Sequence, residues 1–134
     1  MARLAVWAWM LVLVGLSVPA IASAGAVDLR ISYGDGAGHR KAGHLICDSR
    51  GPRATGYLRS RDPAKLCRAA YRLKRFLAAP PPENRMCTQI YGGPDRARVR
   101  GNVADARVDR IFTRTNGCEV ADWGHAQALL PRPA

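Results

Sequence analysis

Val27-Asp28-Leu29-Arg30-Ile31-Ser32-Tyr33 alternates apolar and polar residues, and the interpretation of the whole chain starts from this segment. Strict alternation is typical of a β-strand that buries one of its faces. The cluster Gly34-Asp35-Gly36-Ala37-Gly38 predicts a turn after this strand. A second strand is predicted from Lys41 to Cys47, so the two strands and their turn indicate an antiparallel hairpin.

A helix is predicted next, after an exposed loop over residues 48–62 for which a short strand at Ala54–Leu58 is the alternative. Asp62 is a good N-cap and Pro63 suits the first helical position. Apolar residues then recur at helical spacing and form one stripe, which consists of Leu66, Ala70, Leu73 and Leu77. The run Pro80–Pro82 must end this helix, because proline cannot continue it.

Two further strands are predicted at Arg96–Val103 and Ala106–Thr113, followed by a short helical turn at Glu119–Trp123. The segment from Leu129 onward, with two prolines, is predicted to be a frayed tail. Strands, a helix, an exposed loop and strands again indicate a single α+β domain, in which a helix covers one face of an antiparallel sheet.

The first 24 residues have the features of a secretory signal peptide. Arg3 supplies the positive start, an apolar run extends from Leu4 to Val18, and Ala22-Ser23-Ala24 forms a small-x-small cleavage site. The alternative is an uncleaved anchor, but the run is shorter than the roughly 20 residues of a typical membrane span. We expect a mature domain of residues 25–134 that is secreted, extracellular and not attached to a membrane.

Four cysteines lie in the expected mature domain, at Cys47, Cys67, Cys87 and Cys118. An even number in an exported chain indicates two disulfides, for which three pairings are possible. Sequential pairing would close the two shortest separate loops. No C-x-x-C pair occurs, so a zinc site is not indicated, and we expect neither a metal nor a cofactor.

The chain is strongly basic, with 21 Lys and Arg against 10 Asp and Glu and a net charge of +11. A solvated basic surface is the simplest interpretation. The alternative is a secreted module that binds polyanions or nucleic acid. Its candidate residues are Arg68, Arg72, Arg75, Arg96, Arg98 and Arg100. The last three would share one face of a strand.

Met86-Cys87-Thr88-Gln89-Ile90-Tyr91-Gly92-Gly93-Pro94 is the most informative motif for function. Thr115-Asn116-Gly117-Cys118-Glu119 places another cysteine inside a polar turn. If Cys87 and Cys118 are bridged, the Gln89-Ile90 bond lies on a segment that is anchored at its base. Protease clefts accept anchored, extended and exposed peptides of this kind. An ordinary loop that leads into a strand is the alternative interpretation.

These two motifs, the order of the cysteines and Ile31-Ser32-Tyr33-Gly34 together resemble the subtilisin-inhibitor-like family of exported actinobacterial proteins, typified by Streptomyces subtilisin inhibitors. The similarity extends from about Val27 to Val120. It implies a five-stranded antiparallel sheet with one main and one short helix, and the sequential pairing of the disulfides. It also implies a homodimer in which the sheets of two copies pack together.

The resemblance further implies a substrate-like inhibitor of subtilisin-type serine proteases. Gln89 would enter the specificity pocket of the protease, and Gln89-Ile90 would be the scissile bond. Asn116 would brace the loop from behind. The protease-binding loop would consist of Met86, Cys87, Thr88, Gln89, Ile90, Tyr91 and Gly92. The predicted partner is therefore a subtilisin-like protease, with no specific nucleic-acid partner.

An enzyme is not expected, because an inhibitor of this kind has no catalytic residues of its own. A small basic nuclease would need two histidines, or a histidine with a glutamate, beside a cation. The sequence offers His39, His44, His125, Glu83 and Glu119, but nothing in it places two of them in one cleft. No serine lies in a G-x-S-x-G motif.

Overall fold

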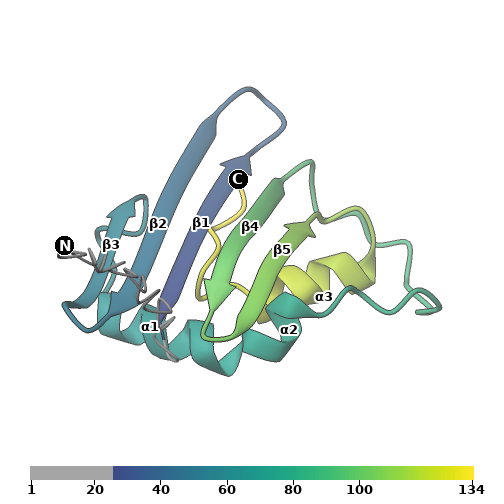
Figure 1. The fold of residues 1–134 in the computed structure, drawn as a ribbon. Coiled ribbons are helices and arrows are strands. Elements are labelled where there is room, and N and C mark those ends of the chain that lie inside the picture. Colours follow the sequence, from purple (N-terminus) through teal and green to yellow (C-terminus); the bar gives the residue numbers. More distant parts are fainter. Residues whose placement is uncertain (1–25) are drawn as a thin grey trace, which may run out of the picture.

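Five strands form one antiparallel sheet in the order β3-β2-β1-β4-β5 (Figure 1). They are β1 (Val27–Gly34), β2 (Arg40–Asp48), β3 (Gly51–Gly56), β4 (Arg96–Val103) and β5 (Ala106–Phe112). The structure is a computed structural model and describes residues 26–134. The predicted signal peptide, residues 1–24, lies outside the described residues. The prediction of a single α+β domain with an antiparallel sheet is confirmed.

The alternating residues of β1 form the centre of the core, because this strand lies in the middle of the sheet. Val27, Leu29, Ile31 and Tyr33 are at most 5% exposed, whereas the polar residues between them are exposed. β1 pairs with β2 on one side and with β4 on the other. One face of the sheet is therefore apolar and the other is polar, as the alternation predicted.

Helices cover the apolar face (Figure 1). They are α1 (Pro63–Arg72), α2 (Lys74–Ala78) and α3 (Gly117–His125). Asp62 is the N-cap of α1, and its side chain accepts hydrogen bonds from the backbone of Ala64 and Lys65. The predicted helix is interrupted at Leu73, after which α2 continues the same buried stripe to Leu77. A disulfide from Cys47 to Cys67 joins β2 to α1.

Two sequence predictions are wrong in this part of the molecule. The exposed loop predicted over residues 48–62 contains β3, which pairs with β2 from Gly51 to Gly56. Gly51 has a φ of 100°, a left-handed conformation that lets the chain reverse immediately after β2. β3 therefore begins earlier than the alternative short strand at Ala54–Leu58.

The predicted frayed tail is also wrong. Leu129 and Leu130 are completely buried, and the hydroxyl of Tyr57 donates to the Leu129 carbonyl at 2.6 Å. Burial of two leucines outweighs the tendency of nearby prolines to leave a segment unstructured. Within residues 26–134, no helix combines the length and the apolar character needed to cross a bilayer.

Candidate functional site

The connection between α2 and β4, residues 79–95, contains no helix or strand and projects from one end of the molecule (Figure 1). Its tip carries the bond suggested by the sequence. Met86 is fully exposed, Ile90 is 60% exposed and Tyr91 is 64% exposed, and Gln89 between them is exposed as well. Large apolar side chains gathered at the surface commonly mark a contact with another molecule.

A disulfide between Cys87 and Cys118 anchors the N-terminal side of this tip to the first turn of α3. The two Cα atoms are 5.2 Å apart. The structure therefore has the sequential pairing that the resemblance implies. The cross-link stands two residues before Gln89, so the segment on this side of the bond cannot move far from α3.

Two backbone hydrogen bonds bracket the exposed tip. The Gly117 amide donates to the Thr88 carbonyl at 2.9 Å, and the Gly92 amide donates to the Arg114 carbonyl at 2.7 Å. Arg114 belongs to the segment that joins β5 to α3, and Gly117 is the first residue of α3. The three residues between the hydrogen bonds, residues 89–91, are left facing solvent.

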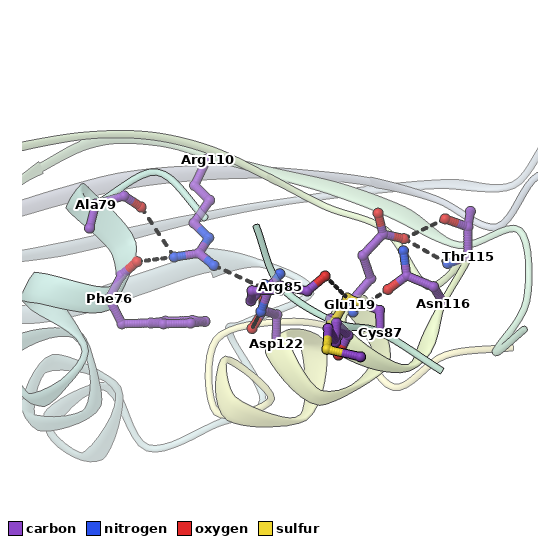
Figure 2. Close-up of polar contacts among 11 residues, drawn as sticks. Phe76, Ala79, Arg85, Cys87, Arg110, Thr115, Asn116, Glu119 and Asp122 are labelled. Atoms are coloured by element: carbon purple, nitrogen blue, oxygen red, sulfur yellow. Dashed lines mark hydrogen bonds and ion pairs between the residues drawn. A yellow bond between two sulfur atoms is a disulfide. The ribbon is translucent and has the colours of Figure 1, made fainter. Parts of the chain in front are cut away.

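The entry to the loop is also held by an ionic network (Figure 2). Arg85 donates two hydrogen bonds to the two carboxylate oxygens of Asp122 on α3, both at 2.9 Å. Arg110 on β5 donates to the same carboxylate at 3.0 Å. This buried guanidinium lies 3.9 Å from the centre of the Phe76 ring and also donates to the carbonyls of Phe76 and Ala79.

Burial is the main influence on the pKa of Arg110 in this network. Desolvation lowers the pKa of Arg110 despite the nearby Asp122 carboxylate, because the charged form loses its water. Arg110 thus needs Asp122 as its compensating charge. The Asp122 carboxylate consequently joins β5 and α3 to the loop, and Arg110 extends this network to the end of α2.

The C-terminal side of the loop is anchored by a second carboxylate, Asp95, which is only 2% exposed. It accepts hydrogen bonds from the Tyr33 hydroxyl at 2.6 Å, from Arg114 at 2.9 Å and from the Ala134 amide at 3.2 Å. Burial alone would raise the pKa of Asp95, but these hydrogen bonds outweigh it and lower the pKa. Burial and the bond to Asp95 raise the pKa of Tyr33 to about 12.

Asn116 is the N-cap of α3, and its side-chain oxygen accepts a hydrogen bond from the Glu119 amide at 3.1 Å. The Glu119 carboxylate accepts in return from the backbone and the hydroxyl of Thr115, at 2.8 and 2.5 Å (Figure 2). This reciprocal arrangement resembles a capping box. Direct contact with the loop comes from the next residue, Gly117. A bracing role for Asn116 itself stays a prediction.

Sequence reasoning missed most of the side chains that support the loop. The missed residues are Arg85, Asp95, Arg114 and Asp122. Nothing in the sequence distinguishes Arg85 and Arg114 from the other arginines of a solvated basic surface, and no motif singles out Asp95 or Asp122. The one available signal was the glycine immediately before Cys118, since glycine often marks a close approach between two backbones.

The structure does not bring the histidines together. His39 in the β1–β2 turn contacts Asp35 at 2.6 Å, and His44 on the open face of the sheet contacts Asp28 at 2.7 Å. His125, at the end of α3, packs against Phe76. Each histidine has a different partner on a different part of the described chain.

Comparison with known families, with characterised proteins and with solved structures finds no match to this chain.

Proposed function

We propose that this protein is a secreted, substrate-like inhibitor of subtilisin-type serine proteases that offers the Gln89-Ile90 bond. The observation that carries the proposal is the exposed tip, residues 89–91, between two backbone hydrogen bonds and a disulfide. Gly93, with a φ of 123°, turns the chain back after the tip. Two disulfides in a small domain also fit an exported protein.

Rigidity is the physical basis of the inhibition. A flexible peptide loses conformational entropy when a protease binds it, whereas a loop already held in shape avoids much of this loss. Here the loop is fixed at both ends by contacts that exist before any protease arrives. An interface of standard size, roughly 1,600 Å² in total, would suffice for tight binding.

The same contacts oppose release after cleavage. The N-terminal side of a cut at Gln89-Ile90 stays attached through Cys87–Cys118, and the C-terminal side through Gly92 and Asp95. The new amine therefore remains beside the acyl-enzyme at a high effective concentration and reforms the peptide bond. All the chemistry belongs to the protease, with its catalytic serine and oxyanion hole.

Gln89 should determine which proteases are inhibited. Glutamine is long and uncharged, so it fits a broad, mostly apolar pocket but cannot pair with an acidic pocket floor as lysine would. We expect the purified mature protein to inhibit subtilisin stoichiometrically and trypsin weakly. Gln89→Lys should make the protein a strong inhibitor of trypsin.

Titration of both proteases with wild type and Gln89→Lys tests this expectation. Mass analysis of the complexes should show one cut, after Gln89. Equal and strong trypsin inhibition by both variants would exclude Gln89 from this role. Cleavage at many bonds, with no loss of subtilisin activity, would overturn the proposal.

A further inference from the structure

The face of the sheet opposite the helices is open and strongly basic. Register and alternation place the even-numbered residues of β1, β2, β4 and the odd-numbered residues of β3 and β5 on this face. Its arginines are Arg30, Arg40, Arg53, Arg96, Arg98, Arg100 and Arg107. Only three aspartates accompany these seven arginines, namely Asp28, Asp48 and Asp109.

Two arginines face each other at the centre of this open face. Arg30 on β1 lies directly opposite Arg100 on β4, although like charges in such cross-strand pairs are destabilising. Arg30 has no ion pair among the described residues, and Arg100 approaches Asp109 only to 3.8 Å. That aspartate already binds Arg98 at 2.7 Å. A locally unfavourable arrangement of this kind is typical of a binding site.

Two shallow depressions on the open face are lined by these arginines. One, of about 470 Å³, is lined by Arg30, Arg98 and Arg100 together with polar residues such as His44 and Thr55. The other, of about 700 Å³, is lined by Arg40, Arg96 and Arg98 among others. Arg98 belongs to both, so the depressions adjoin. Neither of them has a carboxylate in its lining.

We propose that this open face binds a linear polymer of phosphate groups that carries no bases. Guanidinium groups bind phosphate through paired hydrogen bonds, so arginine is the residue type expected in such a site. Successive arginines on β4 stand about 7 Å apart along the strand, which suits repeated anionic groups on a flexible chain.

Two observations argue against other occupants. No Phe, Tyr or Trp lies in the outward rows of the five described strands, so the face lacks the large aromatic platforms on which nucleic-acid bases stack. His44, the one imidazole in these rows, is held by Asp28 at 2.7 Å. The homodimer implied by the resemblance, in which the sheets of two copies pack together, would bring two sets of these arginines together about a two-fold axis, so the present proposal is an alternative to that prediction. Burying like charges against each other is costly.

The test uses short-chain inorganic polyphosphate as the probe and calorimetric titration at several salt concentrations. Arg30→Gln/Arg100→Gln removes two charges from the open face. Arg68→Gln/Arg72→Gln removes the same charge from exposed positions on α1, on the other side of the sheet. We expect the sheet variant to weaken binding at least about tenfold and to lower the salt slope by about two, with little change in the helix variant.

Equal weakening in both variants would show that net charge alone attracts the probe, and would overturn the proposal. Tighter binding of a single-stranded oligonucleotide than of polyphosphate would also overturn it. So would a wild-type dimer in sedimentation that fails to bind the probe. Circular dichroism should show that both variants are folded. Subtilisin inhibition should be unchanged in both, so the outcome is independent of the proposed inhibitory function.

Discussion

Gly117 shows how a single residue can determine the shape of the loop. A Cβ at this position would stand 2.0 Å from the Thr88 hydroxyl oxygen and 3.3 Å from its Cβ. Glycine is therefore what allows the start of α3 to lie directly against Thr88 and to donate its amide to the Thr88 carbonyl. The backbone there has no need of a left-handed conformation, so space is the deciding factor.

Gly117→Ala should displace Thr88 and loosen the loop, because the new methyl group overlaps the hydroxyl. Overpacking of this kind costs about 1–3 kcal/mol. We expect a weaker inhibition constant for subtilisin and faster cleavage after Gln89. Gly124→Ala is the matched control in the same helix, since nothing lies within 4 Å of its added Cβ.

The control should raise the free energy of unfolding by about 0.5–1 kcal/mol and leave inhibition unchanged. Thermal unfolding and inhibition are measured for both variants. Similar effects of the two alanines on inhibition would show that the contact between Gly117 and Thr88 does not shape the loop.

At the scale of elements, α3 is the platform on which the loop rests. It contributes Cys118 to the disulfide, Gly117 to a backbone hydrogen bond and Asp122 to the ionic network. The Asp122 carboxylate serves two arginines with different tasks. Arg85 belongs to the loop and is partly exposed, whereas Arg110 belongs to the core and is buried.

Substitution can separate these two tasks. Arg85→Gln should change the free energy of unfolding by less than about 1 kcal/mol, because a partly exposed ion pair contributes little. It should nevertheless weaken inhibition, since the loop entry is freed. Asp122→Asn should lower the free energy of unfolding by about 3–5 kcal/mol, because it leaves the Arg110 charge uncompensated.

Urea unfolding and subtilisin titration measure both properties. Arg75→Gln, at an exposed position on α2, controls for loss of positive charge. If Arg85→Gln inhibits as tightly as this control, the Arg85–Asp122 pair does not position the loop.

Elements with a clear period could be predicted from the sequence, and elements defined by distant contacts could not. The alternation from Val27 to Tyr33 gave β1 correctly, and Asp62-Pro63 located the start of α1. β3 lacks alternation, because Gly51, Pro52 and Gly56 occupy half of it, and its pairing with β2 decides its structure. The loop itself was found through its cysteines, but its ionic supports join residues far apart in sequence.

At the scale of the whole molecule, the domain places its two candidate surfaces on separate parts. The loop projects beyond one end of the sheet, and the basic face lies opposite the helices (Figure 1). Tyr33 connects the core to the loop, because its hydroxyl donates to Asp95 from the central strand. Stability of the domain and presentation of the loop are therefore coupled.

This coupling predicts a dependence on alkaline pH. The folded-state pKa of Tyr33 is raised to about 12 from an ordinary value of 10.0, so its contribution is complete below pH 10. That contribution is lost as the pH rises toward 12. Tyr33→Phe should lower the free energy of unfolding by about 1–3 kcal/mol at neutral pH, because Asp95 loses a buried donor.

The difference between wild type and Tyr33→Phe should shrink as the pH rises above about 10. Urea unfolding between pH 7 and the alkaline limit measures it. A difference that stays constant over this range would show that the Tyr33 hydroxyl does not titrate with the raised pKa.

The position of β1 between β2 and β4 has a consequence for the order of assembly. β1, β2, β3 and α1 are contiguous in sequence and can associate early, whereas β4 begins only at Arg96, after the projecting segment. The edge of β1 that pairs with β4 therefore stays unpaired until β4 docks. Contacts between residues far apart in sequence, such as those of β1 with β4, slow folding. Lengthening residues 79–85 by a few glycines should slow refolding in stopped-flow experiments while leaving the unfolding rate nearly constant. An altered unfolding rate with unchanged refolding would instead show that β4 docks after the rate-limiting step.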